Sequence, residues 1–73
     1  MYHVISTPDC RWCDMAKKLL EDRGLDYSED LIVTQEQKKA FVRKGYRTVP
    51  QVFEGETHIG GYEDLFKHLS AKS

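Results

Sequence analysis

The chain has 73 residues, with 11 lysines and arginines against 12 aspartates and glutamates, and a formal net charge of -1. This length leaves room for a single domain, and the near-neutral charge argues against a protein whose main ligand is nucleic acid, because such proteins usually have a strongly basic balance. Hydrophobic residues make up 40% of the chain, and no apolar run approaches the roughly 18 residues of a membrane span. We therefore expect one folded domain over residues 1–73, with neither a nucleic-acid nor a membrane partner.

The N-terminal segment and the cysteine count indicate the compartment. Residues 1–10 lack the basic stretch and the following apolar run that form a secretory signal. Two cysteines are also too few for a disulfide-dense secreted scaffold. Both observations favour a cytoplasmic protein.

The first half of the chain is predicted to form a strand, a helix and a second strand. Residues 2–5 are apolar and β-prone, and turn formers follow at residues 6–9. A second strand is expected within residues 25–33. Between the two strands, apolar residues recur at helical spacing until an Arg-Gly pair ends the pattern; they are Trp12, Met15, Ala16, Leu19 and Leu20.

The second half is predicted to form a helix, a hairpin and a final helix. Residues 34–37 have the form of a capping box, so this helix should begin after Thr34 and run to about Lys44. A third strand is expected at residues 49–53, a fourth at residues 57–59, and a helix after the glycine pair that follows. The order β-α-β-α-β-β-α predicts an α/β fold with three helices and a four-stranded mixed sheet, because the first unit gives a parallel pair and the hairpin adds antiparallel strands.

Two cysteines separated by two residues fall at the start of the first predicted helix. A helix N-terminus lowers the pKa of a thiol because its unpaired amides and the helix dipole stabilise the thiolate. Cys10 would therefore be the attacking nucleophile, and Cys13 would resolve the mixed disulfide formed on it. Arg11 adds a positive charge beside Cys10, which Asp9 and Asp14 oppose.

A zinc site is the main alternative for this cysteine pair, with His3, His58 and His68 as further ligands. The sequence has no second C-x-x-C and no H-x₃₋₅-H pair, so we expect no metal. A structural disulfide is also disfavoured, since so short a loop constrains the unfolded chain very little. A C-x-x-C that follows a strand and opens a helix favours redox chemistry.

Three motifs resemble those of the glutaredoxin family, and together they cover nearly the whole chain. Residues 10–13 (Cys-Arg-Trp-Cys) stand where the family has Cys-Pro-Tyr-Cys, and residues 48–50 match its Thr-Val-Pro. Residues 60–64 (Gly-Gly-Tyr-Glu-Asp) match its Gly-Gly-x-x-Asp. The short length is similar to that of the compact dithiol members from bacteria or viruses. The resemblance implies a thioredoxin-like fold and a dithiol thiol–disulfide oxidoreductase with glutathione as co-substrate.

The resemblance also implies where glutathione binds. A cis bond before Pro50 would turn the Val49 backbone toward the active site, where it would pair with the tripeptide. The amides after Gly60 would hold the γ-glutamyl carboxylate, and Asp64 would hold the amino group. The implied glutathione-binding residues are Arg11, Trp12, Thr48, Val49, Pro50, Gly61, Tyr62, Glu63 and Asp64.

Four of these residues have a purely structural alternative. Pro50 can protect an edge strand, and Trp12 can be the first core residue of its helix. Glu63 and Asp64 can act only as first-turn acids that complement the dipole of their helix.

The sequence departs from the family where many members carry a lysine three residues before the first cysteine, because this chain has Thr7 there. A basic segment follows later in the chain and fits either a solvated helix face or a surface that attracts anionic ligands; its basic residues are Lys38, Lys39, Arg43, Lys44 and Arg47. Arg43 or Arg47 can replace the missing lysine.

Taken together, these features predict a monomer that reduces protein disulfides and glutathione mixed disulfides. Ribonucleotide reductase is among the clients that the resemblance implies. Two alternatives stay open: a redoxin served by thioredoxin reductase, and a dimer that bridges an iron–sulfur cluster through Cys10 and glutathione.

Overall fold

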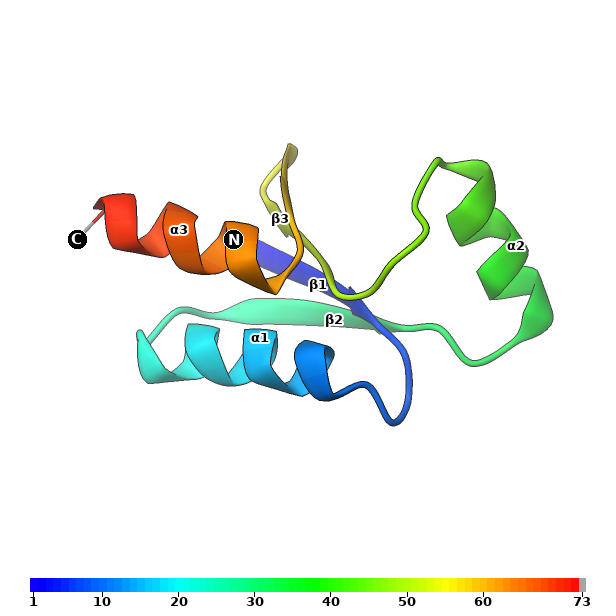
Figure 1. The fold of residues 1–73 in the computed structure, drawn as a ribbon, viewed down its shortest axis with the longest axis horizontal. Helices are drawn as coiled ribbons and strands as arrows, with labels where there is room; N and C mark the ends of the chain where they lie inside the picture. The colour runs from blue at the N-terminus through cyan, green and yellow to red at the C-terminus, as the bar shows by residue number, and fades with distance from the viewer. Residues whose placement is uncertain (73) are drawn as a thin grey trace.

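The computed structural model describes residues 1–72, which form four strands and three helices in the predicted order (Figure 1). The elements are β1 (Tyr2–Ser6), α1 (Arg11–Asp22), β2 (Tyr27–Leu31), α2 (Gln35–Arg43), β3 (Gln51–Glu54), β4 (Thr57–Gly60) and α3 (Tyr62–Lys72). The strands form one sheet in the order β2-β1-β3-β4, in which only β1 and β2 are parallel. The predicted α/β fold class with a mixed four-stranded sheet is confirmed. Among the described residues, no helix is long and apolar enough to cross a membrane.

One face of the sheet is covered by α1 and α3, which lie side by side (Figure 1). The alternation of β1 explains why this face carries the core, since residues 2, 4 and 6 are buried while residues 3 and 5 are half-buried. α1 packs on β1, α3 packs on β3 and β4, and the two helices pack on each other. The core cluster consists of Tyr2, Val4, Ala16, Leu20, Val52, Leu65 and Leu69.

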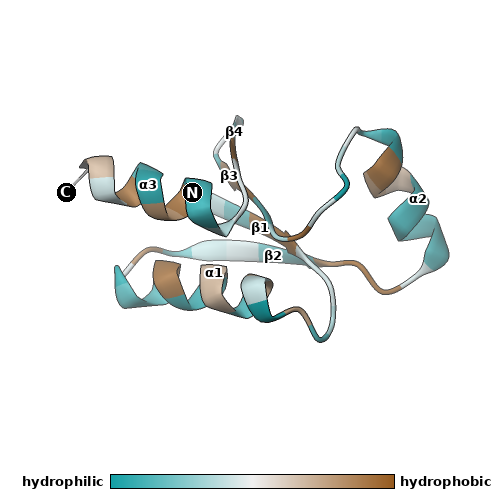
Figure 2. Ribbon diagram, in the orientation of Figure 1, coloured by the Kyte–Doolittle hydropathy of each residue, from teal (hydrophilic) through white to brown (hydrophobic). Residues whose placement is uncertain are grey.

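α2 is held by local interactions more than by the core. The predicted capping box is present: Thr34 Oγ1 accepts from the Gln37 N–H at 3.1 Å, and Gln37 Oε1 accepts from the Thr34 N–H at 3.0 Å. No residue of α2 is buried, and its surface is largely hydrophilic (Figure 2). Its Phe41 ring contacts Tyr46 in the following loop, with centroids 5.3 Å apart, and Tyr46 meets Phe53 of β3 edge-on. α2 is therefore attached to the sheet largely through ring contacts made by the loop that follows it.

The structure corrects the expectation for Pro50. β3 begins at Gln51, so Pro50 precedes the strand instead of lying within it, because proline has no N–H to donate to the ladder. β3 also lies between β1 and β4, so the alternative in which Pro50 protects an edge strand is wrong.

The predicted apolar stripe of α1 is only partly core. Ala16 and Leu20 are fully buried, but Trp12 is 52% exposed and Met15 is 37% exposed. The first turn of α1 faces the start of α3, where the Trp12 ring contacts the Tyr62 ring at a centroid distance of 5.8 Å. The alternative in which Trp12 is a core residue is therefore wrong.

Candidate active site

The two cysteines open α1, as predicted. Cys10 is the N-cap residue with an extended backbone, and its Sγ accepts a hydrogen bond from the Cys13 N–H at 3.1 Å. The two side chains are joined as a disulfide with their Cα atoms 5.2 Å apart, so the structure represents the oxidised pair. Cys10 is half-buried, whereas Cys13 is fully buried. This difference in exposure supports the predicted order of reaction, in which Cys10 meets the client first.

The loop before Cys10 directs the chain into the helix. Asp9 has a positive φ of 57°, a left-handed conformation that aspartate adopts more readily than most residues. The first backbone bond of the helix then runs from the Asp14 N–H to the Cys10 carbonyl at 3.1 Å. Cys10 Sγ thus lies at the N-terminal end of the helix, where unpaired amides and the helix dipole favour a thiolate over a thiol.

A hollow of about 310 Å³, which we call the site hollow, opens at the first turn of α1. It is formed by three segments that are distant in sequence: the start of α1, the loop before β3 and the start of α3. The lining residues are Trp12, Thr48, Val49, Pro50, Gly61, Tyr62, Glu63 and Asp64. All eight belong to the set predicted to bind glutathione. The ninth member, Arg11, is exposed and is not among the lining residues.

Two backbone segments form facing walls of the site hollow. The Val49–Pro50 peptide is cis, as the resemblance implies. Gly61 lies close to this peptide, since a Cβ placed on it would be 3.7 Å from the Pro50 carbonyl oxygen. Gly60 has a φ of 125°, and a side chain there would overlap the Asp64 carboxylate, so the position requires glycine.

Asp64 has a local role that does not block a role in binding. Its Oδ2 accepts from the Gly61 N–H at 3.3 Å and so closes the first turn of α3. The carboxylate is nevertheless exposed beside the hollow, and it can accept from the ammonium group of a ligand as well.

Gln51 is a positioning residue that the sequence reasoning missed. It is only 7% exposed, and its Nε2 donates to the Thr48 carbonyl at 2.8 Å and to Thr48 Oγ1 at 3.2 Å. Its Oε1 accepts from His58 Nε2 at 2.6 Å. Gln51 of the sheet thus holds Thr48 in place, and with it the wall of the site hollow that residues 48–50 form. The available signal was a polar glutamine directly after Pro50, among the apolar residues of the strand predicted at residues 49–53.

A polar network attaches α1 to the sheet below the cysteines. The Glu29 carboxylate accepts from Lys17 Nζ at 2.7 Å and from Ser6 Oγ at 2.5 Å. The hydrogen bond from Lys17, assisted by that from Ser6, lowers the pKa of Glu29 below its ordinary value. The same bond to Glu29 raises the pKa of Lys17. Because Lys17 follows Cys13 by four residues, this network lies on the helix face that also carries the buried cysteine.

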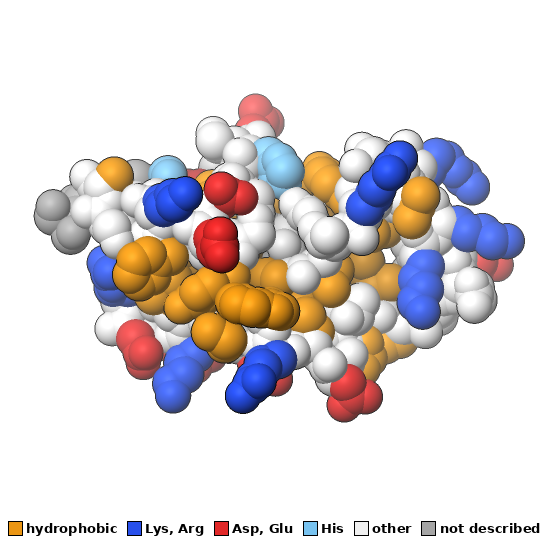
Figure 3. Space-filling view, in the orientation of Figure 1, with side chains coloured by type: hydrophobic (Ala, Val, Ile, Leu, Met, Phe, Trp, Pro, Cys, Tyr) orange, Lys and Arg blue, Asp and Glu red, His pale blue; other side chains and the backbone are white. Residues whose placement is uncertain are grey.

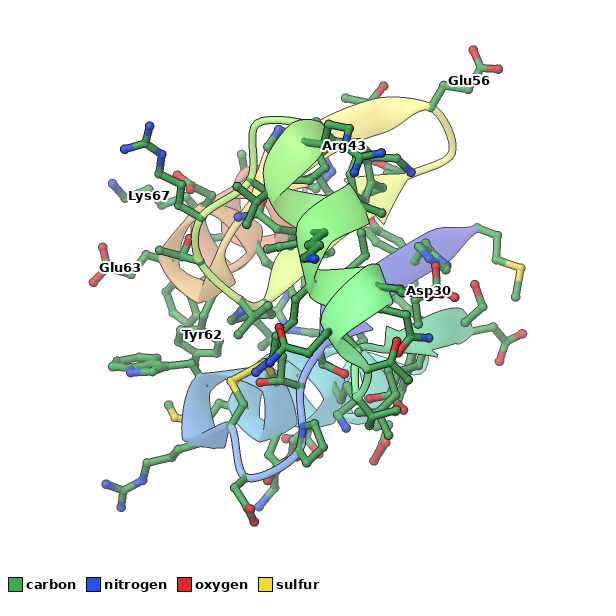
Figure 4. The ribbon with its side chains drawn as sticks, turned by 90° about the vertical axis from the view of Figure 1, so that its right-hand side faces the viewer. Asp30, Arg43, Glu56, Tyr62, Glu63 and Lys67 are labelled. Atoms are coloured by element: carbon green, nitrogen blue, oxygen red, sulfur yellow. A yellow bond between two sulfur atoms is a disulfide. The ribbon has the colours of Figure 1, made fainter. Side chains whose placement is uncertain are left out.

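The basic residues 38–47 do not line the site hollow, although Arg47 directly precedes Thr48. Arg43 and Arg47 are exposed, and neither lines the hollow. Thr7, which stands where many family members have a lysine, is half-buried. Figure 4 shows Arg43 on α2, well separated from Tyr62 and Glu63 on α3. That Arg43 or Arg47 replaces the family lysine stays a prediction. Within residues 1–72 no group of three histidine, cysteine or acidic side chains is arranged to hold a metal ion.

A cysteine pair at the start of a helix, set in a thioredoxin-like sheet beside a ligand-sized hollow, defines a thiol–disulfide oxidoreductase. Residues 3–59 match the sequence profile of the Glutaredoxin family. The chain therefore belongs to the glutaredoxin family.

Curated relatives agree with this assignment. The chain is 41% identical over 64 residues to a glutaredoxin of Neisseria meningitidis serogroup A, and the match covers 82% of this chain and 74% of that protein. It is 42% identical over 69 residues to the hybrid peroxiredoxin hyPrx5 of Haemophilus influenzae, covering 92% of this chain. The chain spans only 28% of the length of hyPrx5, which is a much larger protein.

Solved structures confirm the thioredoxin-like fold. The buckwheat glutaredoxin–glutathione complex superposes with a TM-score of 0.80 at 32% identity, covering 97% of this chain and 70% of that one. The glutaredoxin-like NrdH-redoxin of Escherichia coli, whose activity profile is described as thioredoxin-like, superposes with a TM-score of 0.74 at 23% identity. This second match covers 90% of this chain and 91% of that one, and it shows the fold alone.

Proposed function

We propose that the protein reduces protein disulfides and glutathione mixed disulfides with electrons from glutathione. The observation that carries this proposal is the site hollow, where eight residues predicted to bind glutathione come together at the helix end that bears the cysteines. The glutathione complex of the buckwheat relative supports it. Ribonucleotide reductase is the client that we propose from the family resemblance, with the protein acting as a cytoplasmic monomer.

The chemistry follows from the exposure of the two sulfurs. The Cys10 thiolate attacks one sulfur of the client disulfide, the client S–S bond breaks, and one client thiolate leaves with its electron pair. The Cys13 thiol then gives up its proton and attacks Cys10 Sγ, which releases the second client thiolate and leaves the Cys10–Cys13 disulfide. Two glutathione thiols restore the dithiol and depart as glutathione disulfide, so two electrons pass from glutathione to the client.

In the proposed complex the two walls of the hollow hold opposite parts of glutathione. The backbone N–H and C=O of Val49 pair with the cysteine of the tripeptide, which directs its sulfur to Cys10. At the other wall, the first amides of α3 bind the γ-glutamyl carboxylate and Asp64 binds the ammonium group. The Trp12 and Tyr62 rings flank the sulfur.

The proposal is tested with the wild type, Cys10→Ser and Cys13→Ser, each supplied with either the glutathione reductase system or thioredoxin reductase. We expect glutathione to support turnover, Cys10→Ser to abolish it, and Cys13→Ser to spare glutathione mixed disulfides while impairing reduction of protein disulfides. Full activity of Cys10→Ser would overturn the assignment of the nucleophile. Reduction by thioredoxin reductase alone would overturn the role of glutathione.

A further inference from the structure

Exposed apolar side chains continue beyond the site hollow along the seam between α1 and α3. Phe66 is 48% exposed, one helical turn after Tyr62, and Met15 is 37% exposed one turn after Trp12. The Trp12 and Tyr62 ring centroids are 5.8 Å apart, and those of Tyr62 and Phe66 are 6.4 Å apart. Figure 3 shows hydrophobic side chains gathered along this seam. We call these four residues the seam strip.

The seam strip is continuous with the site hollow. A second hollow of about 260 Å³ is lined by Tyr62, Glu63, Phe66 and Lys67, and it shares Tyr62 and Glu63 with the first. Figure 4 shows Tyr62, Glu63 and Lys67 leaving α3 on the same side. Because the two hollows share lining residues, a ligand that fills the site hollow can extend onto the strip.

The fold does not require an apolar residue at Phe66. The core-facing side of α3 is already supplied by Leu65, which is 0% exposed, and by Leu69, which is 4% exposed. Half-exposed aromatic rings that contact each other form a contiguous apolar patch, and such patches on small soluble domains are characteristic of interaction sites. Glutathione would end at Gly61 and Asp64, so it would not cover Phe66.

We propose that the seam strip binds the polypeptide on the N-terminal side of the reacting cysteine in a client protein. This rests on the proposed function, in which a cysteine backbone pairs with Val49 and its N-terminal side points toward Gly61. A client that pairs in the same direction carries its preceding residues past Gly61 and onto α3. The strip therefore distinguishes protein clients from glutathione, which is too short to reach it.

The dimensions of the strip predict which client residues contact it. The Tyr62 ring centroid lies 5.8 Å from that of Trp12 and 6.4 Å from that of Phe66, so the strip from Trp12 to Phe66 extends over at most about 12 Å. An extended chain rises about 3.3 Å per residue and its side chains alternate between two faces, so the client residues about two and four positions before the cysteine face the strip. We expect aromatic or branched aliphatic side chains at these positions.

The test measures thiol exchange on Cys10 in the Cys13→Ser protein, in which a peptide thiol displaces glutathione from its mixed disulfide with Cys10. Three synthetic peptides differ only in the placement of phenylalanine: two and four residues before the cysteine, two and four residues after it, or replaced by serine throughout. We expect the first peptide to be favoured about tenfold over the serine peptide because apolar area is buried. If phenylalanine after the cysteine favours the exchange as much as phenylalanine before it, the proposal is overturned.

Two variants separate the strip from general hydrophobic attraction. Phe66→Ser should remove the gain that phenylalanine before the cysteine gives, whereas Val42→Ser, at a similarly exposed apolar residue of α2, should keep this gain.

A small substrate separates the strip from the proposed function. In a chain with both cysteines, Phe66→Ser should turn over the mixed disulfide of cysteine and glutathione at the wild-type rate. If the wild type fails with that small substrate, the proposed function is wrong; if it succeeds but the peptides do not differ, only the strip is wrong. A wild-type dimer that Phe66→Ser converts to a monomer in sedimentation equilibrium would also overturn the proposal, because the strip would then join copies of this chain.

Discussion

α3 and α2 each connect directly or through a loop to one wall of the site hollow, but the two helices are stabilised in different ways. α3 forms one wall of the site hollow with its first turn and buries Leu65 and Leu69 in the core. α2 precedes the opposite wall, buries no residue and depends on a capping box and on ring contacts of its following loop. The opposite wall is nevertheless fixed, because Gln51 of β3 holds Thr48 through its side chain. Both walls of the site are therefore supported by the sheet and the α1–α3 layer, and α2 is free to carry a polar, basic surface.

The largest difference is expected in the free energy of unfolding, when a core residue of α3 and a surface residue of α2 are each replaced by alanine. Leu65→Ala should lower the free energy of unfolding by about 3 kcal/mol, because it removes a buried side chain and leaves a cavity. Val42→Ala, at a residue of α2 that is 59% exposed, should cost less than about 0.5 kcal/mol. Urea unfolding measures both values, and equal losses would show that α2 contributes to the core as much as α3 does.

The second prediction concerns the support of the Thr48 wall. Gln51→Leu keeps much of the side-chain volume but removes the hydrogen bonds to Thr48, so this wall should lose its fixed position. We expect kcat/KM with glutathione mixed disulfides to fall about tenfold, which corresponds to about 1.4 kcal/mol of transition-state stabilisation. Steady-state kinetics with the variant provide the measurement. An unchanged kcat/KM would mean that α2 and its loop position Thr48 unaided.

The third prediction concerns the attachment of α1 and has a defined pH dependence. The folded-state pKa of Glu29 is lowered by Lys17 and Ser6, so its contribution is complete above its unfolded value of 4.5 and is lost as the pH falls below that value. Lys17 has a raised pKa, so its share persists below 10.5 and is lost as the pH rises through the raised folded value.

Glu29→Gln should therefore cost about 1 kcal/mol at neutral pH and flatten the loss of stability on acidification. Thermal unfolding between pH 3 and pH 7, at about five values, tests this expectation. Glu56→Gln, at the exposed hairpin turn, is the matched control and should leave the profile unchanged. A Glu29→Gln profile as steep as that of the wild type would exclude the network as its cause.

The smallest effect on the whole domain is expected at the cap of α2. Thr34→Ala removes an N-cap hydrogen bond worth about 1 kcal/mol to the helix. Because α2 lies outside the core, we expect this loss to appear as roughly fivefold faster hydrogen exchange in α2, with little change in global unfolding. Amide exchange followed by NMR separates the two. Equal acceleration in α3 would show that the two helices open together.

Features governed by local chemistry could be predicted from the sequence. The capping box at Thr34 and the helix start at Cys10 depend on residues within one turn of each other, and both are present. The residues of the three motifs were also found, and eight of the nine predicted ligand-binding residues line one hollow. Arg11 is exposed and lies outside this lining.

Features that depend on tertiary neighbours could not be predicted. The spacing of apolar residues in α1 does not reveal that Trp12 and Met15 are partly exposed while Ala16 is buried in the core. The role of Gln51 depends on the path of the chain before Pro50, which brings the Thr48 carbonyl within reach of its amide. Periodicity identifies an apolar face, but the packing of two helices decides how much of that face is covered.

One consequence follows from the position of Cys10 as the N-cap of α1. Its sulfur accepts a hydrogen bond from the Cys13 N–H, and a thiolate accepts such a bond more strongly than a neutral sulfur does. By linkage, the free energy with which this bond lowers the thiol pKa equals the free energy that deprotonation adds to the first turn of the helix. A substitution that strengthens or weakens this hydrogen bond therefore changes the acidity of the nucleophile and the stability of the helix start together.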